Sequence, residues 1–308
     1  MQTLGADAQE AEVMNLRSML FVPGDSEKKL AKVAGGSADA LILDLEDAVA
    51  KERLPLARGM VAEYLKSSRA KAASQQRWVR INPMSTPDAL PDLAAIVVGA
   101  PDGIVVPKTN SGADAILLDH YLTALETREG VEVGSIKIFA VATETPTAMF
   151  TLGTFTGATP RLYGMTWGAE DLPAAVGASS NLDDAGNLDF TYQLARSLCL
   201  LAATAAGVEP IDTVYTDFRD RDGLGRNARA ARRAGFTGKI AIHPDQVEII
   251  NEAFTPSAED VAYAKRVIEV FAAGVGTVSL DGKMLDKPHL TQAHRVLAAA
   301  DAAARRRS

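Results

Sequence analysis

Charged side chains follow several short apolar runs of the sequence, where they could meet and do chemistry. The residues at these positions are Asp44, Glu46, Asp47, Arg80, Lys108, Glu144, Glu170 and Asp171. If the ends of the runs meet, the carboxylates exceed what Arg80 and Lys108 can neutralise. Carboxylates gathered in one cavity repel each other, and one of them would normally take up a proton. A divalent cation removes this repulsion, so we expect a metal site among these residues.

The donor atoms indicate which metal this site would bind. The acidic set is rich in oxygen and poor in histidine, because His243 is the only one of the four histidines that follows a predicted strand. Magnesium usually takes one or two carboxylates together with waters and substrate oxygens, whereas zinc prefers histidine or cysteine. We therefore expect Mg²⁺, with Mn²⁺ as an alternative, and not zinc.

Arg80 has two interpretations. A planar guanidinium binds a carboxylate through two parallel hydrogen bonds, so beside a metal it suits the carboxylate of an oxo acid. The alternative is an internal ion pair with Glu46 or Asp47, and the two roles are compatible. His243 precedes a proline, which favours a structural role over a functional one.

The elements that position these residues follow from the hydrophobic pattern. Eight short apolar runs alternate with longer segments of helical spacing, and the runs cover residues 19–22, 40–43, 78–81, 103–106, 136–142, 162–165, 213–215 and 239–242. Continuous apolar runs are typical of strands covered on both faces, and strand–helix repetition indicates a parallel sheet. Eight repeats predict an α/β fold, a (β/α)₈ TIM barrel, with an open Rossmann-like sheet as the alternative. In such a barrel, functional residues lie at the carboxyl ends of the strands.

The pattern divides the chain into three parts. Residues 1–16 are predicted to form a flexible leader, and residues 17–255 the catalytic barrel. Residues 256–308 contain two helical segments around a glycine-rich stretch, which is too little for a separate domain. We therefore expect a C-terminal helical extension that acts as a lid over a barrel mouth, its own or that of a neighbouring subunit.

Composition excludes several classes of protein. The 308 residues carry a formal net charge of −7, without the basic face that nucleic-acid binding requires. The single cysteine, Cys199, lies in an apolar segment, which excludes a disulfide scaffold and predicts a buried core residue. No apolar run is long enough to span a membrane, and no secretory signal is visible, so we expect a cytoplasmic protein. Residues 223–228 loosely match a dinucleotide fingerprint but are far from a first βα unit, so we interpret them as a loop leading into a helix.

Seven motifs in order resemble the citrate lyase β-subunit and malyl-CoA lyase family of the aldolase/citrate lyase superfamily. They are Arg17-Ser-Met-Leu-Phe-Val-Pro-Gly24, Leu43-Asp-Leu-Glu-Asp47, Val79-Arg-Ile-Asn82, Val106-Pro-Lys108, Glu144-Thr-Pro146, Gly168-Ala-Glu-Asp171 and Ile242-His-Pro-Asp-Gln246. An eighth, Asp281-Gly-Lys-Met-Leu-Asp-Lys-Pro288, resembles the lid of the family's stand-alone coenzyme A lyases. The resemblance covers residues 17 to about 300 and implies a TIM barrel with a metal at its mouth.

The resemblance also implies roles for the residues of the barrel mouth. Glu144 and Asp171 match the Mg²⁺ ligands of the family, and Arg80 matches the arginine that grips the oxo-acid carboxylate. Glu46 and Asp47 match catalytic acidic residues that order the metal's waters and the substrate.

Three further residues match positions that contact coenzyme A or close the site. Arg17 and Lys28 fall where members of the family contact coenzyme A. Asp286 matches the aspartate of the lid, which in relatives reaches into the site of a neighbouring subunit. The resemblance therefore implies a homo-oligomer, a trimer or a hexamer.

The implied activity is a Mg²⁺-dependent carbon–carbon lyase that reversibly cleaves a 3-hydroxy-acid coenzyme A thioester into a 2-oxo acid and a short acyl-CoA. Malyl-, methylmalyl- and citramalyl-CoA are the expected substrates. The alternatives are a citrate lyase β-subunit that acts on a thioester of an acyl-carrier protein, a thioester-free 2-oxo-acid aldolase, and a non-catalytic metal-binding barrel. The lid motif favours the coenzyme A branch.

Overall fold

The computed structural model describes residues 16–68, 75–273 and 276–306. The chain divides into a barrel unit, residues 16–254, and a C-terminal unit that begins at residue 255. Most of the predicted leader therefore lies outside the described residues. Leu16, which we placed in the leader, is instead fully buried with the core of the barrel.

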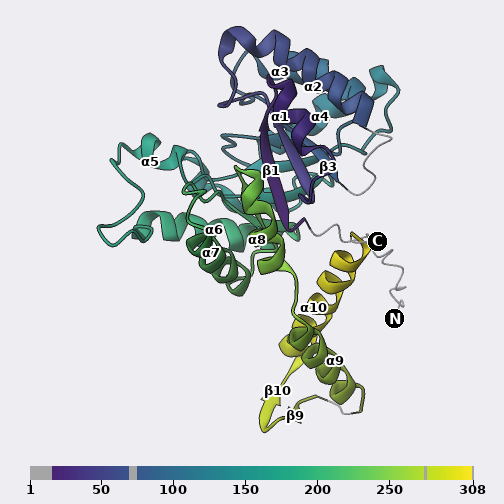
Figure 1. Cartoon of the computed structure of the whole chain (residues 1–308), viewed down its shortest axis with the longest axis vertical. Coiled ribbons are helices and arrows are strands. Elements are labelled where there is room, and N and C mark those ends of the chain that lie inside the picture. Colours follow the sequence, from purple (N-terminus) through teal and green to yellow (C-terminus); the bar gives the residue numbers. More distant parts are fainter. Residues whose placement is uncertain (1–15, 69–74, 274–275, 307–308) are drawn as a thin grey trace, which may run out of the picture. The chain divides into compact units, whose positions relative to one another are not determined.

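The barrel unit is a closed barrel of eight parallel strands in sequence order, as predicted (Figure 1). Its strands are β1 (Ser18–Pro23), β2 (Ala40–Asp44), β3 (Gln76–Arg80), β4 (Gly103–Val106), β5 (Lys137–Val141), β6 (Leu162–Thr166), β7 (Glu209–Asp212) and β8 (Gly238–Ala241). The α-helices between and after them are α1 (Glu27–Val33), α2 (Leu54–Ser68), α3 (Ala89–Ile96), α4 (Gly112–Glu129), α5 (Asp171–Val176), α6 (Phe190–Ala206), α7 (Arg221–Ala234) and α8 (Pro244–Phe254). Strand β8 pairs with β1, which closes the ring.

The strand predicted at residues 213–215 is wrong, because β7 spans Glu209–Asp212 instead. Only two residue pairs join β7 to each neighbour, so this strand has a short ladder. The glycines of the loose dinucleotide fingerprint were also placed wrongly. Gly223 and Gly225 lie inside α7 and not in a loop.

Helix α4 illustrates how the sequence sets the bounds of an element. Ser111 and Asp114 form a capping box at its beginning, which satisfies backbone N–H groups that have no partner within the helix. Gly130 ends the helix with φ of 67°, a left-handed conformation that glycine adopts at little cost. The helix therefore runs from Gly112 to Glu129.

Alternate residues of the strands fill the inside of the barrel. Met19, Ala40, Ile42, Trp78 and Phe139 belong to one buried apolar cluster, which also contains residues from β4, β7 and β8. The rings of Trp78 and Phe139 meet edge to face with their centres 6.1 Å apart. Because side chains alternate between the two faces of a strand, the next inward positions after Ile42 and Trp78 are Asp44 and Arg80. The apolar interior thus becomes polar at the carboxyl ends of β2 and β3.

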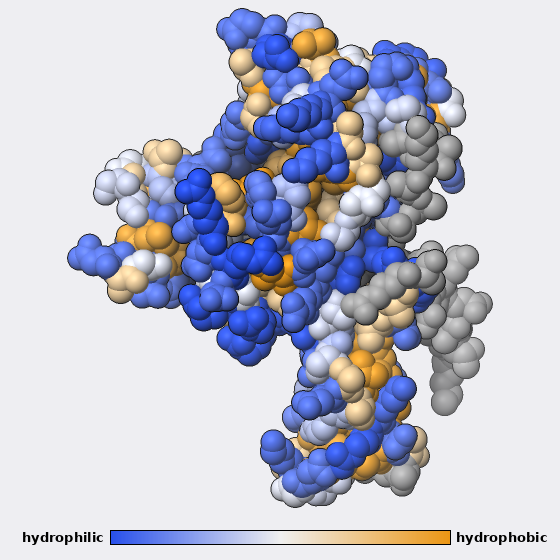
Figure 2. All heavy atoms as spheres, in the orientation of Figure 1, coloured by the Kyte–Doolittle hydropathy of each residue, from blue (hydrophilic) through white to orange (hydrophobic). Residues whose placement is uncertain are grey.

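A second apolar cluster lies between the barrel wall and the surrounding helices. It joins outward-facing strand residues such as Leu41, Leu43 and Ile104 to helix residues such as Leu65 and Leu118. Cys199 belongs to this cluster and is fully buried, as predicted. On the outside, hydrophilic side chains cover most of the visible face of the barrel unit (Figure 2).

The C-terminal unit contains α9 (Ala258–Ala273), the antiparallel strands β9 (Val278–Leu280) and β10 (Lys283–Leu285), and α10 (Lys287–Arg305). The two helices pack against each other, and Ala264, Val267, Leu280, Leu285 and Ala293 form a small core. Asp286 is the N-cap residue of α10 and forms a capping box with His289. None of the helices that the structure describes is long and apolar enough to cross a membrane.

Candidate active site

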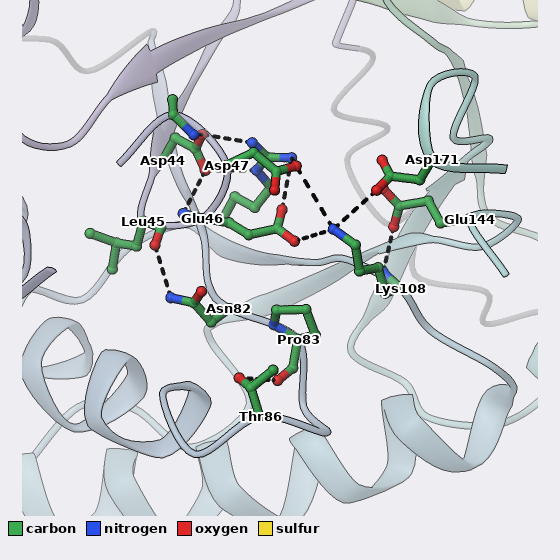
Figure 3. Close-up of polar contacts among 12 residues, drawn as sticks. Asp44, Leu45, Glu46, Asp47, Asn82, Pro83, Thr86, Lys108, Glu144 and Asp171 are labelled. Atoms are coloured by element: carbon green, nitrogen blue, oxygen red, sulfur yellow. Dashed lines mark hydrogen bonds and ion pairs between the residues drawn. The ribbon is translucent and has the colours of Figure 1, made fainter. Parts of the chain in front are cut away.

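The barrel brings most of the predicted site residues together at one mouth (Figure 3). Glu46, Lys108, Glu144 and Asp171 follow β2, β4, β5 and β6, and Arg80 is the last residue of β3. Because the strands are parallel, all five stand at their carboxyl ends. Charges from five neighbouring strands therefore converge in one place.

Arg80 makes a two-pronged ion pair with Asp44, its register partner on β2. Its Nε donates to Oδ1 of Asp44 at 2.7 Å and its Nη2 to Oδ2 at 2.6 Å. The guanidinium carbon lies 4.5 Å from the centre of the Phe21 ring. Although burial opposes it, hydrogen bonding and the charges of Asp44 and Glu46 raise the pKa of Arg80. The guanidinium is therefore charged and fixed in one plane.

The two acidic residues after β2 differ in their surroundings. Glu46 is buried, and its Oε2 lies 2.9 Å from Nη1 of Arg80. Burial raises the pKa of Glu46 to about 6, although Arg80 and Lys108 oppose this shift. Asp47 is largely exposed and lies 3.5 Å from the same Nη1 atom. The expected internal ion pairs of Arg80 with Glu46 and Asp47 are thus present, and Asp44 adds a third and closer partner.

Lys108 is central to the mouth, with its ammonium between carboxylates from both sides (Figure 3). The Nζ atom is 2.5 Å from Oε1 of Glu46, 3.2 Å from Oδ1 of Asp171 and 3.8 Å from Oδ2 of Asp47. Burial opposes it, but the hydrogen bond to Glu46 and the surrounding carboxylates raise the pKa of Lys108. Its φ of 51° is left-handed, which is uncommon for a residue with a long side chain.

Glu144 follows β5 and is buried, with only 4% of its surface exposed. It accepts a hydrogen bond from the backbone N–H of Lys108. Burial, together with the charges of Asp171 and Glu46, raises the pKa of Glu144 to about 8. Gly168 makes this position possible, because a Cβ atom there would lie 2.2 Å from Cγ of Glu144.

Asp171 begins α5 and is about one third exposed. The segment before it is held by Trp167, whose indole N–H donates to Oδ1 of Asp212 at 2.8 Å. Asp212 also pairs with Nζ of Lys239 at 3.0 Å and with Nε of Arg196 at 3.0 Å. Burial opposes it, but Lys239 and Arg196 lower the pKa of Asp212 to about 2. A buried charged network thus supports the segment that carries Asp171.

The carboxylates of Glu144 and Asp171 suit a hard metal ion. The charge of Asp171 contributes to the raised pKa of Glu144, and no cationic side chain is in direct contact with Glu144 among the described contacts. No three histidine, cysteine, aspartate or glutamate side chains form a metal-binding group in the described parts of the chain. Two carboxylates, completed by water and substrate oxygens, fit Mg²⁺ better than zinc.

Arg17 stands apart from this site. It precedes β1 and therefore lies at the opposite end of the barrel, where its Nε and Nη2 donate to Asp39 at 2.9 and 2.8 Å. This ion pair is buried. We therefore assign Arg17 a structural role instead of the expected contact with coenzyme A. Lys28 follows the carboxyl end of β1 and is exposed at the beginning of α1, a position open to a ligand.

Asp286 belongs to the C-terminal unit, where its carboxylate is about half exposed and its Oδ1 lies 2.6 Å from Nδ1 of His289. Its backbone position at the beginning of α10 is fixed by the capping box. His243 stacks on Phe218 with ring centres 5.0 Å apart and faces Asp245 at 3.5 Å. These contacts agree with the structural role that we favoured for His243.

Two residues that support the site had no individual role predicted from the sequence. Asp44 holds Arg80, and Asp212 holds Trp167. Spacing could have indicated Asp44, because Ala40, Ile42 and Asp44 alternate along β2 and so share its inward face. No comparable signal existed for Asp212, since the predicted seventh strand was misplaced.

The fold and the site define a class of protein: a TIM-barrel enzyme with an acidic mouth suited to a metal ion and an oxo acid. Comparison with known proteins narrows this class. The family model described as HpcH/HpaI aldolase/citrate lyase matches residues 17–244. A second model, described as a C–C bond lyase of the TIM-barrel fold, matches residues 194–303.

Individual relatives align over nearly the whole chain. Citrate lyase subunit beta of Haemophilus influenzae is 36% identical over 91% of this chain and 95% of its own length. The (3S)-malyl-CoA thioesterase of Cereibacter sphaeroides is 35% identical over 94% of this chain and 95% of its own. The crystal structure of CitE from Mycobacterium tuberculosis with magnesium, acetoacetate and coenzyme A is 33% identical, with a TM-score of 0.75, over 94% of this chain and 99% of that one.

The chain belongs to the HpcH/HpaI aldolase/citrate lyase family, so the resemblance seen in the sequence motifs is confirmed. The prediction that it is an enzyme that cleaves carbon–carbon bonds is confirmed with it.

Proposed function

We propose that this chain is a Mg²⁺-dependent lyase that reversibly cleaves a 3-hydroxyacyl-CoA thioester into a 2-oxo acid and a short acyl-CoA. The observation that carries the proposal is that Glu144 and Asp171 share one barrel mouth with the fixed guanidinium of Arg80, to which Lys108 and Glu46 connect them. A metal ion and a guanidinium in the same mouth suit the adjacent hydroxyl, or oxo, and carboxylate oxygens of the substrate. Relatives named for citrate lyase and malyl-CoA support the same substrate class.

In this proposal Glu144 and Asp171 hold the metal ion, Mg²⁺ or in its place Mn²⁺. When bound, the ion would polarise the substrate's hydroxyl oxygen and favour loss of its proton. Arg80 binds the substrate carboxylate through the Nη1 edge that faces Glu46 and Asp47. Asp44 keeps this edge oriented, because it occupies Nε and Nη2.

Glu46 and Asp47 act on the proton of the substrate hydroxyl group. With a pKa of about 6, Glu46 is ionised at neutral pH yet basic enough to accept a proton. As the hydroxyl proton leaves, the C–C bond breaks and its electron pair moves to the thioester as an enolate. Asp286, in its acid form, donates a proton to the enolate carbon and completes the acyl-CoA. In the reverse direction Asp286 removes that proton.

The remaining roles concern coenzyme A and assembly. Lys28 is exposed where a phosphate or pantetheine group could reach it. Asp286 comes from the C-terminal lid of a neighbouring subunit in a homotrimer or hexamer, which we place in the cytoplasm. A closed lid excludes water and so protects the enolate from premature protonation.

A citrate lyase β-subunit is the second candidate, because the Haemophilus influenzae relative aligns over almost its whole length. It would perform the same bond cleavage on a thioester carried by an acyl-carrier protein. The Cereibacter sphaeroides relative, named a (3S)-malyl-CoA thioesterase, favours a further variant in which the thioester is hydrolysed. A thioester-free aldolase would need neither Lys28 nor Asp286.

Proton exchange at the enolate carbon tests the proposal. The enzyme is incubated in D₂O with Mg²⁺, acetyl-CoA or propionyl-CoA, and oxalate, which has the adjacent oxygens of a 2-oxo acid but cannot accept the enolate. We expect mass spectrometry to detect deuterium in the acyl group, and a chelator to stop its incorporation. Absence of exchange with every free acyl-CoA would contradict the proposal and favour the carrier-dependent subunit or the thioester-free aldolase.

A further inference from the structure

Lys108 contacts both halves of the acidic mouth. Its ammonium lies 2.5 Å from Glu46 and 3.2 Å from Asp171, and its backbone N–H donates to Glu144. One residue therefore links the two carboxylates proposed to hold the metal with the acidic group beside Arg80. Figure 3 shows the ammonium between Glu46 on one side and Asp171 and Glu144 on the other.

We propose that the Lys108 ammonium is an internal counter-cation that competes with the metal ion for Asp171 and thereby sets the metal affinity of the site. This inference rests on the proposed function, because it takes Glu144 and Asp171 as the metal-binding carboxylates. In the metal-free enzyme the ammonium stabilises carboxylates that would otherwise repel each other. The ammonium is 3.2 Å from Oδ1 of Asp171, so a metal ion at that carboxylate would meet a positive charge that opposes its binding.

Charge and distance indicate how this exchange proceeds. A divalent ion at Asp171 carries twice the charge of the ammonium and repels it at short range. Glu46 remains available to Lys108, since its Oε1 is the nearest of the three carboxylate contacts. The ammonium therefore withdraws from Asp171 and stays paired with Glu46.

The backbone of Lys108 provides a fixed point for this movement. Its left-handed φ of 51° accompanies the hydrogen bond from its N–H to Glu144. The side chain can thus leave Asp171 by rotation about its own bonds while the peptide continues to hold Glu144. Exchange of the ammonium for a metal ion then needs no rearrangement of the barrel strands.

Titration calorimetry of the metal-free full-length protein with MgCl₂, at one pH and ionic strength, tests the proposal. Lys108→Met removes the ammonium and retains an unbranched side chain, and Lys108→Gln is a second variant without the charge. Lys66→Met is the matched control, since Lys66 is exposed on α2 and pairs only with Glu63 among the described contacts. All three variants lose one positive charge, so the control corrects for the change in net charge.

We expect both Lys108 variants to bind Mg²⁺ about tenfold more tightly than the wild type, a change of about 1.4 kcal/mol, and Lys66→Met to bind like the wild type. Circular dichroism verifies that each variant is folded. Binding by the variants but not by the wild type would also support the proposal. If the wild type binds Mg²⁺ and both Lys108 variants bind it equally or more weakly, the competition is refuted while the proposed function stands. If no protein binds Mg²⁺, both are refuted.

Discussion

Asp44 and Arg80 are paired twice, once through the backbone register of β2 and β3 and once through their side chains. Both hydrogen bonds between the guanidinium and the carboxylate are shorter than 3 Å, at 2.7 and 2.6 Å. Asp44 is almost completely buried, with 1% of its surface exposed. The pair therefore ends the apolar interior of the barrel and begins its reactive mouth. Its geometric consequence is that only Nη1 of Arg80 points toward the remaining acidic residues.

Asp44→Asn tests whether this pairing serves catalysis. The amide cannot accept both guanidinium hydrogen bonds, so Arg80 loses its fixed plane. Small errors in the position of a substrate-binding group cost about a hundredfold in rate. We expect kcat/KM to fall about a hundredfold, with Mg²⁺ affinity little changed, as steady-state kinetics and calorimetry would measure.

Asp39→Asn is the matched control, because Asp39 makes a similar buried pair with Arg17 at the opposite end of the barrel. Removing one partner of a buried ion pair destabilises a protein by roughly 3 kcal/mol. We expect both variants to unfold at lower urea concentration, but only Asp44→Asn to lose turnover. If Asp44→Asn keeps the same turnover as Asp39→Asn and the wild type, Asp44 serves stability alone.

Asp171→Asn tests the proposed metal site. The amide has no charge with which to hold a divalent ion. The stabilisation of the transition state by the metal, on the order of several kcal/mol, is therefore lost. We expect turnover to fall about a thousandfold and Mg²⁺ binding to weaken, while circular dichroism remains that of the wild type. Glu170→Gln removes the exposed neighbouring carboxylate and should change neither. Mg²⁺-dependent turnover at the normal rate in Asp171→Asn would remove Asp171 from the site.

The barrel could be predicted from sequence because its strands are covered on both faces. Runs such as residues 40–43 and 103–106 are continuously apolar, and both lie within or coincide with observed strands. Strand β7 could not be found in this way, because its sequence Glu-Pro-Ile-Asp contains two charged residues and a proline. The adjacent residues 213–215 have higher strand propensity. Ladder pairing with β6 and β8 overrode that local preference.

The members of the site could largely be predicted from sequence, but their contacts could not. Strand-end position identified Glu46, Arg80, Glu144 and Asp171, and the structure brings all four to the same mouth. The contacts of Lys108 with three carboxylates depend on the closure of the barrel and on the left-handed backbone of Lys108. Arg17 illustrates the opposite case, since it belongs to a family motif but precedes β1 and pairs with Asp39 at the other end of the barrel.

Asp286→Asn distinguishes the proposed role of Asp286 as a general acid from its structural role at the beginning of α10. Asparagine is as good an N-cap residue as aspartate, so α10 should keep its beginning. The amide cannot donate a proton to the enolate, and removal of a general acid costs about 10²- to 10⁴-fold in rate. We expect turnover to fall within this range while Mg²⁺ affinity is unchanged.

The control for this variant is Asp281→Asn in the same C-terminal unit. Asp281 is exposed and pairs with Arg266 at 2.5 Å, outside the proposed chemistry. The Asp281→Asn variant should retain wild-type kinetics. Unchanged kinetics in Asp286→Asn as well would exclude Asp286 from proton transfer.

The raised pKa of Glu144 predicts that the stability of the metal-free enzyme depends on pH. Burial raises its pKa from the ordinary value of 4.5 to about 8, so the folded state binds the proton more tightly than the unfolded state. The stability that the neutral form contributes is therefore present below about pH 4.5 and is lost as the pH rises through about 8. We expect urea denaturation to give a free energy of unfolding that falls from pH 6 to pH 9.

Glu144→Gln provides the comparison, because it cannot ionise and should remove this part of the pH dependence. Saturating Mg²⁺ should have a similar effect on the wild type, since a bound cation favours the carboxylate form. Identical pH profiles for the wild type and Glu144→Gln without metal would contradict the assignment of a raised pKa to Glu144.

The most direct test of the account is a mass-spectrometric cleavage assay with Mg²⁺ and malyl-, methylmalyl-, citramalyl- and citryl-CoA, each with and without chelator. The account predicts release of a 2-oxo acid together with a short acyl-CoA from at least one of the first three thioesters, abolished by the chelator and restored by added Mg²⁺. Cleavage of none of the four thioesters, or cleavage that continues undiminished in the chelator, would contradict it.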